Sequence, residues 1–213
     1  MHLPRALAGV ASALSLSSRQ FEPDSVAYSD AATGLKFASY SSDGHVQFRV
    51  AVPSTVTAGT EFDAVLQVVA PVSMGWAGFA WGGSMTYNPL AIVWANGTNN
   101  VVLSSRIAYG YYTPPVYTSA NYTILKTGTH VNATHFQVTA LCKGCSKWGD
   151  EETGITEIDP TQQVTFGFAY SSNQVDHPAD IESSFGIHDS TGHPIFELAV
   201  AKNDNFAATV AKL

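Results

Sequence analysis

The chain has 213 residues, of which 45% are hydrophobic and 13% are charged. This length favours one domain, or one domain with tails, and the apolar fraction is ample for a core, which excludes a disordered chain. The formal net charge of −7 and the lack of any run of Lys or Arg argue against nucleic acid and anionic membrane surfaces, because both attract clustered basic residues.

The first nineteen residues have the pattern of a secretory signal. Arg5 is followed by Ala6–Leu16, a stretch of small residues and leucines that is too short to span a bilayer. We predict a signal peptide over residues 1–19, export from the cell, and one domain over residues 20–213. A frayed helical N-terminus is the simpler alternative.

From about Leu35 onward, short apolar runs alternate with turn residues. The runs span residues 46–52, 62–69, 75–81, 90–95, 101–109, 135–141, 163–170 and 195–200. They are rich in Val, Phe, Tyr, Thr and Trp, which is typical of an antiparallel all-β sandwich. We expect short helical turns only around Asp176–Ser183, and a ragged end over Asn205–Leu213.

The stretch from Val72 to Trp94 departs from the alternation of a half-buried strand. It holds three of the four tryptophans and is apolar or Gly on both faces until Gly82-Gly83, after which Ser84-Met85 follows. Gly inside a strand marks a bulge or a close approach to the backbone. Two interpretations stay open: a tightly packed strand with a Gly-Gly turn, or an aromatic surface ending in a thioether that suits a flat apolar ligand.

Three glycosylation sequons begin at Asn96, Asn121 and Asn132. Together with the signal pattern they support an extracellular protein, and they predict exposed positions for the three side chains. The sequence has no hydrophobic C-terminal tail, so it indicates neither a membrane anchor nor a lipid anchor.

The two cysteines form the motif Cys142-Lys143-Gly144-Cys145. In an exported protein this pair is most simply a disulfide that closes a tight turn. A thioredoxin-like redox site needs a βαβ context that the sequence does not show, and covalent haem attachment needs His where Ser146 stands.

Patterns for hydrolytic catalysis are weak. Asp150, Glu151 and Glu152 form an acidic run between predicted strands, which is usually a solvated face, although the carboxylates of a glycosidase can be distant in sequence. Gly82-Gly83-Ser84 lacks the closing Gly of a nucleophile elbow. A glycosidase is therefore a distant third hypothesis.

Two residues outside these patterns could bind a metal. Met85 ends the aromatic stretch, and His188 lies in a Gly-flanked segment before the last predicted strand. The spacing of His188 and His193 does not fit zinc. A neutral imidazole and a soft thioether can together ligate a haem iron.

The chain resembles the haem-binding cytochrome domain of fungal cellobiose dehydrogenase. The segments that carry the resemblance occur in the same order over nearly the whole mature chain: Gly75–Met85, Leu90–Gly97, Ser104–Tyr111, Tyr117, Cys142–Cys145 with Trp148, and Phe185–His188. The resemblance implies a DOMON-type β-sandwich with immunoglobulin-like layers, and one non-covalent haem b in a pocket at one end or face.

The resemblance also implies the iron ligands. Met85, in Gly82-Gly83-Ser84-Met85, matches the axial Met of the family, and His188, which follows Phe185-Gly186-Ile187, matches its axial His. Met74 and His193 rank second because the residues around them match less well.

Further residues are implied around the haem. Trp76, Phe79 and Trp81 would form an apolar shell, while Arg106 and Tyr111 lie where the family places groups near the haem edge, within reach of a propionate. Cys142 and Cys145 match a family disulfide.

With two axial ligands, the iron keeps no open position, so the resemblance implies a secreted carrier of single electrons rather than an enzyme with catalytic residues of its own. The implied donor is a flavin dehydrogenase, and a copper lytic polysaccharide monooxygenase is the implied acceptor. We expect a monomer that is either an isolated domain or a naturally solitary cytochrome, because the flavin domain of the family is missing from the sequence.

A hypothesis of another class is a non-redox carbohydrate-binding or adhesion sandwich. Tyr109, Tyr111, Tyr112 and Tyr117 could form its exposed aromatic face. Tight binding of cello-oligosaccharides by haem-free protein would favour it.

Overall fold

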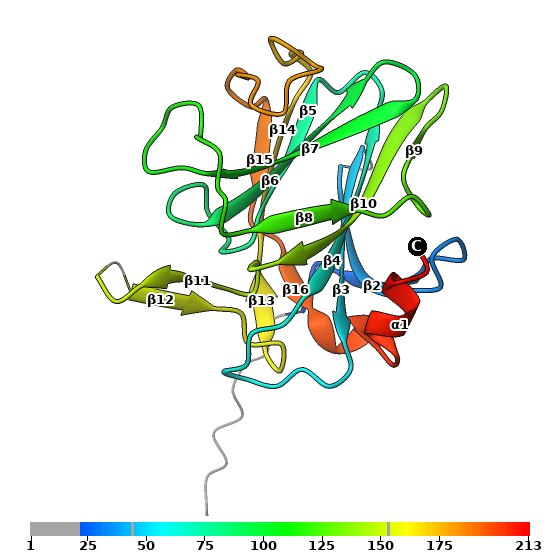
Figure 1. Cartoon of the computed structure of the whole chain (residues 1–213), viewed down its shortest axis with the longest axis vertical. Helices are drawn as coiled ribbons and strands as arrows, with labels where there is room; N and C mark the ends of the chain where they lie inside the picture. Colours follow the sequence, from blue (N-terminus) through cyan, green and yellow to red (C-terminus); the bar gives the residue numbers. More distant parts are fainter. Residues whose placement is uncertain (1–21, 44, 153) are drawn as a thin grey trace, which may run out of the picture.

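The computed structural model describes residues 22–43, 45–152 and 154–213, and the predicted signal peptide lies outside this part. Two β-sheets pack face to face (Figure 1). The larger sheet has the strand order β1 (Val26–Ser29), β2 (Lys36–Ser42), β3 (Val46–Pro53), β4 (Ala64–Pro71), β10 (His135–Lys143), β8 (Asn121–Ile124), with β9 (His130–Val131) beside β10 and β17 (Lys202–Asn203) parallel to β3.

The smaller sheet positions the candidate site. Its strand order is β15 (Ser190–Gly192), β14 (Gly167–Ser171), β5 (Trp76–Ala80), β6 (Pro89–Asn96), β7 (Asn100–Ile107), and every pairing in it is antiparallel. Two small ribbons lie apart: β11 (Lys147–Asp150) with β12 (Gly154–Glu157), and β13 (Gln163–Thr165) with β16 (Ile195–Glu197). The predicted all-β antiparallel sandwich is confirmed.

The main core lies between the two sheets because alternate residues of each strand point inward. Phe48 of β3 stacks on Phe79 of β5 and Phe168 of β14, with ring centroids 5.9 and 5.5 Å apart. Full burial of each such ring contributes about 2 kcal/mol to folding. These contacts fix which face of β5 and β14 points toward the core.

The short helical turns expected around Asp176–Ser183 are present as two hydrogen-bonded turns, in which the Asp180 N–H donates to the His177 carbonyl and the Ser183 N–H to the Asp180 carbonyl. Two other sequence predictions about elements were wrong. The run over residues 163–170 divides at Phe166, because β13 pairs with β16 whereas β14 pairs with β5. Residues 205–213 are not ragged: helix α1 (Phe206–Val210) buries Phe206 and Val210, and it follows the short helix η1 (Leu198–Ala201) and β17.

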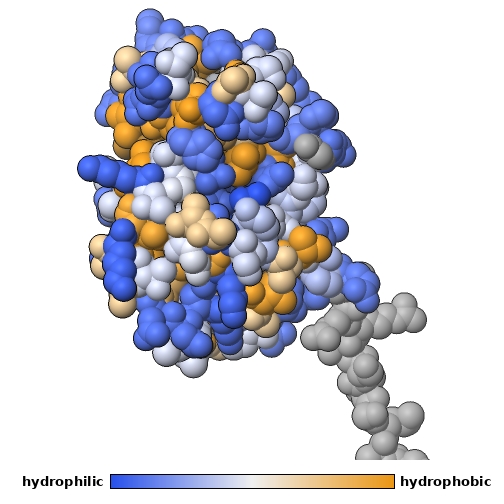
Figure 2. Space-filling view, turned by 90° about the vertical axis from the view of Figure 1, so that its right-hand side faces the viewer, coloured by the Kyte–Doolittle hydropathy of each residue, from blue (hydrophilic) through white to orange (hydrophobic). Residues whose placement is uncertain are grey.

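The side of the molecule that carries the C-terminus shows apolar residues interspersed with hydrophilic ones (Figure 2). Beneath the C-terminal helix, Phe206 and Val210 pack with Leu35, Phe37 and Val65 of the larger sheet. No helix in the described part of the chain is long and apolar enough to cross a membrane.

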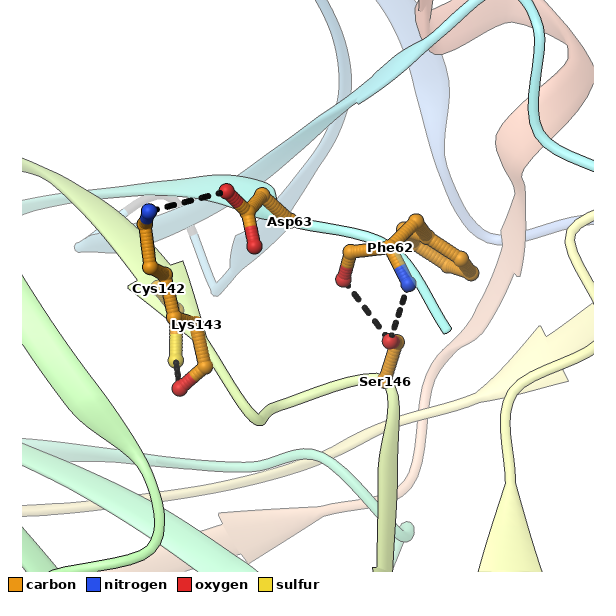
Figure 3. Close-up of polar contacts among 5 residues, drawn as sticks. All are labelled: Phe62, Asp63, Cys142, Lys143 and Ser146. Atoms are coloured by element: carbon orange, nitrogen blue, oxygen red, sulfur yellow. Dashed lines mark hydrogen bonds and ion pairs between the residues drawn. The ribbon is translucent and has the colours of Figure 1, made fainter. Parts of the chain in front are cut away.

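The cysteine turn joins β10 to β11. The structure contains a disulfide between Cys142 and Cys145. The adjacent Ser146 hydroxyl accepts from the Phe62 N–H (2.8 Å) and donates to the Phe62 carbonyl (2.7 Å), while Lys143 lies 3.7 Å from Asp63 (Figure 3). The turn is thus fastened to the segment that enters β4.

Candidate functional site

The site begins with an unusual face of the smaller sheet. We call it the outer face: the side of β5, β6, β7 and β14 that is turned away from the main core. The second face of an antiparallel sheet is often polar and solvated. Here it is apolar and buried, with a cluster formed by Trp76, Ala80, Leu90, Ile92, Trp94, Ala108 and Val175, against which Met85, Val102, Ala169 and Phe185 pack.

A long connection, residues 172–189, lies against this face; we call it the 172–189 loop (Figure 1, orange). Trp94 of β6 donates from Nε1 to the Pro178 carbonyl at 2.9 Å, and the Phe185 ring lies 4.9 Å from the Trp76 ring. At the base of the loop, the Asp189 carboxylate accepts from the backbone N–H and hydroxyl of Ser172, which lowers the pKa of Asp189. The loop is therefore closed at its ends and fastened across the sheet.

Met85 lies on a second connection, between β5 and β6. Asn88 is buried, and its amide nitrogen donates toward the Ser84 carbonyl, the Ser84 hydroxyl and the Thr86 carbonyl at 2.9–3.1 Å. Gly82 makes room for it, because a Cβ there would lie 1.7 Å from Asn88 Oδ1. One side chain thus holds the backbone on both sides of Met85.

The two methionines near this connection lie in different places. Met85 packs against the outer-face cluster, together with Phe185. Met74, the second-ranked candidate, packs against the main core between the sheets. The outer face therefore presents one of these two thioethers.

The two candidate histidines also differ. His188 is exposed and lies in the 172–189 loop, three residues after Phe185 and immediately before Asp189, whose N–H donates to the Tyr170 carbonyl of β14. His193 follows β15, and its Nδ1 lies 2.6 Å from the Gly83 carbonyl. Since a carbonyl only accepts, this nitrogen carries a hydrogen and is committed to the backbone.

The three aromatic residues predicted to form one shell lie on both sides of β5. Trp76 belongs to the outer-face cluster. Phe79 and Trp81 point into the main core, where their rings pack edge to face, 5.2 Å apart. Trp81 Nε1 donates to the Tyr122 hydroxyl at 2.8 Å, and burial raises the pKa of Tyr122. The structure therefore does not bring Phe79 and Trp81 to the face that carries Met85.

Arg106, on β7, is 2% exposed. Its guanidinium donates to the Ser104 hydroxyl and to the backbone carbonyls of Pro114, Ile181 and Ser183. Burial lowers the pKa of Arg106, but the guanidinium of an arginine stays protonated in proteins because its ordinary pKa is so high. Tyr111, in the segment that follows β7, is 93% exposed.

Residues of the outer face fit a flat apolar cofactor such as haem. Trp76 Nε1 is buried and has no hydrogen-bond partner among the described residues, so it offers a donor to a bound group. Gly78, in the middle of β5, lets its neighbours pack flat against the sheet: a Cβ there would lie 3.0 Å from Ile92 Cδ1 and 3.3 Å from the Trp76 ring. The thioether of Met85 and the imidazole of His188 lie on the two connections that border this face, and both are side-chain types that can ligate a haem iron.

Other groups of polar residues give weaker evidence of a functional site. The described residues contain no group of three or more His, Cys, Asp or Glu side chains placed to hold a metal. The acidic run of Asp150, Glu151 and Glu152 lies exposed where β11 turns into β12. Asn96 is half-buried at the end of β6, while Asn121 and Asn132 are exposed.

Sequence reasoning missed Asn88 and Trp94 as residues that shape the site. The sequence signal for Asn88 is an Asn three residues after the methionine and followed by Pro, since Asn commonly bonds to nearby backbone groups in turns. Trp94 contacts Pro178, 84 residues away, and no local pattern reports such a contact.

Comparisons with known proteins agree with this geometry. Residues 28–208 match the family described as the cytochrome domain of cellobiose dehydrogenase, which confirms the predicted resemblance. The pyrroloquinoline quinone-dependent pyranose dehydrogenase of Coprinopsis cinerea is 30% identical over 178 residues, which are 81% of this chain and 23% of that protein. The chain thus spans less than a quarter of the curated relatives it matches.

Two solved structures share the fold. The cytochrome b domain of pyranose dehydrogenase from Coprinopsis cinerea has a TM-score of 0.77 at 24% identity, covering 90% of this chain and 96% of that one. The cytochrome domain of cellobiose dehydrogenase from Myriococcum thermophilum has a TM-score of 0.79 at 23% identity, covering 90% and 97%.

Proposed function

Because the chain belongs to the family of cellobiose dehydrogenase cytochrome domains, we propose that it holds one haem b non-covalently at the outer face and carries single electrons. The observation that supports this most directly is the apolar second face of the smaller sheet, against which Met85 and Phe185 pack. The 172–189 loop covers part of this face through Pro178 and Phe185, and the buried Trp76 Nε1, which has no partner among the described residues, offers a donor to a bound group.

The residues would divide the work as follows. Met85 and His188 would hold the haem iron, and two side-chain ligands would leave no open position for O₂ or a substrate, which favours outer-sphere electron transfer. Trp76 and Phe185 would wall the haem and lower the local dielectric constant. Phe79 and Trp81 support β5 from the main core, one layer below. The bound haem would supply the one-electron chemistry.

The ligand assignment has a matched test. Met85→Ala and His188→Ala should each convert a six-coordinate low-spin haem spectrum into a high-spin one, or prevent haem retention. Met74→Ala and His193→Ala remove the same side-chain types from nearby positions and should keep the wild-type spectrum. A wild-type spectrum in both ligand variants would refute the assignment, and a high-spin spectrum in His193→Ala alone would transfer the role to His193.

The proposed donor is a flavin or quinone dehydrogenase, either fused to the domain or separate, because matched relatives are dehydrogenases much longer than this chain. The proposed acceptor is a copper lytic polysaccharide monooxygenase outside the cell. Stopped-flow mixing of reduced protein with that copper enzyme should show haem oxidation that depends on acceptor concentration. An oxidation rate equal to that in buffer would exclude this acceptor.

A second candidate function is carbohydrate binding without redox chemistry. It is favoured by the tyrosines after β7, since Tyr109, Tyr111 and Tyr112 expose 53%, 93% and 55% of their surface. Calorimetry of haem-free protein with cello-oligosaccharides tests it: saturable binding that is lost in Tyr111→Ala would support this function.

A further inference from the structure

The buried guanidinium of Arg106 joins three parts of the chain. Its Nε donates to the Ser104 hydroxyl (2.6 Å), its Nη1 to the Pro114 carbonyl (2.8 Å), and its Nη2 to the carbonyls of Ile181 and Ser183 (both 2.9 Å). The Ser104 hydroxyl in turn donates to the Ile181 carbonyl at 2.6 Å. Two side chains of β7 therefore grip the same carbonyl of the 172–189 loop.

Every loop acceptor of Arg106 is a neutral main-chain group. Within the described residues, no ion pair joins Arg106 to a carboxylate, although Asp180 and Glu182 counteract part of the pKa decrease that burial causes. Burying a cation costs free energy unless it is well bonded. A planar fork that reaches several carbonyls at once is a geometry that Arg provides and Lys does not.

The two segments that Arg106 bonds come from different parts of the chain. Pro114 belongs to the tyrosine-containing segment after β7, whereas Ile181 and Ser183 precede Phe185 and His188 in the 172–189 loop. The guanidinium also lies 5.7 Å from the Phe185 ring, which packs on Trp76. Loss of the Arg106 guanidinium would therefore loosen both segments and remove its contact with the Phe185 ring, while other bonds still hold the ends of the 172–189 loop.

We propose that Arg106 is a positioning residue that fixes these two segments, and so holds the loop that presents His188. The effect on haem rests on the proposed function, because it requires His188 to bind the iron. The restraint that Arg106 places on the two segments does not rest on the proposed function, because these hydrogen bonds form in haem-free protein as well.

The first experiment uses haem-free protein. Arg106→Met keeps a long apolar side chain but removes every donor. Amide hydrogen exchange in residues 108–116 and 172–184 should accelerate at least tenfold, because bonds to a charged donor contribute about 1.5 kcal/mol or more each. Arg49→Met is the matched control: Arg49 is the other buried arginine of the described chain, 7% exposed and bonded to Gln67 of the larger sheet, and exchange in both segments should stay near the wild-type rate.

Two further variants keep the test decisive if Arg106→Met does not fold. Ser104→Ala removes one of the two donors to the Ile181 carbonyl and should accelerate exchange severalfold in 172–184 only. Arg106→Lys keeps the charge but loses the fork, so it should resemble Arg106→Met. Wild-type exchange in folded Ser104→Ala and Arg106→Lys would overturn the proposal.

The second experiment measures haem. Arg106→Met should release haem to apomyoglobin at least tenfold faster than wild type and show a partly high-spin spectrum, whereas Arg49→Met should do neither. Faster exchange with unchanged haem release and spectrum would overturn the link from the loop to His188. A wild-type chain that binds no haem would refute the proposed function, while the exchange result would still decide whether Arg106 positions the loop.

Discussion

At the scale of single residues, the candidate site depends on polar side chains that contact backbone rather than ligand. Asn88 bonds to the groups on both sides of Met85, and Arg106 bonds to the backbone before His188. Residue type showed only that Met85 and His188 could ligate a haem iron, and the resemblance to the cytochrome family singled them out as the ligands. It assigned Arg106 to the haem edge, whereas four of its hydrogen bonds go to Ser104 and to loop carbonyls.

Replacing Asn88 tests how Met85 is held. Asn88→Asp keeps the volume but puts a carboxylate against carbonyl oxygens, so it should lower the free energy of unfolding by about 2 kcal/mol. In haem-loaded protein, the low-spin spectrum expected from the proposed Met85 ligand should weaken. Denaturant unfolding and visible spectra check both effects. Asn121→Asp, in an exposed strand end, is the control, and an Asn88 variant indistinguishable from it would contradict the expectation.

At the scale of elements, strands with strict alternation were predictable and those fixed by tertiary contacts were not. The runs at 46–52 and 135–141 became β3 and β10 because one face of each is buried in the main core. The stretch from Trp76 to Ala80 is buried on both faces, so its pattern could not say which side meets a ligand. The 172–189 loop has no periodicity, and its place over the sheet follows from contacts with Trp94 and Trp76.

Helix α1 was unpredicted because five residues carry too little pattern, yet its packing should be measurable. Phe206 is 6% exposed against the larger sheet, so Phe206→Ala should lower the free energy of unfolding by about 3 kcal/mol. Val200→Ala on η1, where the side chain is 38% exposed, should cost less than about 0.5 kcal/mol. Equal losses from the two variants would show that α1 does not pack as described. Neither change should alter the haem spectrum, since α1 lies against the other sheet.

At the scale of the whole molecule, charge is unevenly distributed over the two sheets. All six lysines lie in or next to elements of the larger sheet, the β11–β12 ribbon or α1: Lys36, Lys126, Lys143, Lys147, Lys202 and Lys212. The 172–189 loop contains Asp176, Asp180, Glu182 and Asp189 and no basic residue except histidine. The outer face is thus bordered by negative charge.

This distribution predicts how electron acceptors should respond to salt. At low ionic strength, a cationic metal complex should oxidise the reduced protein several times faster than an anionic complex of matched driving force, and the difference should shrink in 0.5 M salt, where the Debye length is only a few ångströms. Stopped-flow rates check this. Asp180→Asn with Glu182→Gln should reduce the difference, whereas Glu151→Gln with Glu152→Gln, an equal change on the β11–β12 ribbon, should not. Equal effects of the two pairs would show that net charge alone is responsible.

Arg106 bonds to the 172–189 loop only through main-chain carbonyls, which has a consequence for how the sequence of the loop can change. A backbone carbonyl accepts the same hydrogen bond whichever side chain its residue carries. Substitutions of Ile181 and Glu182 during evolution should therefore leave the bonds from Arg106 intact. Ile181 is 54% exposed, and Glu182 is exposed as well. The exposed side chains of this part of the loop can therefore differ between homologues while the backbone beneath them keeps its conformation.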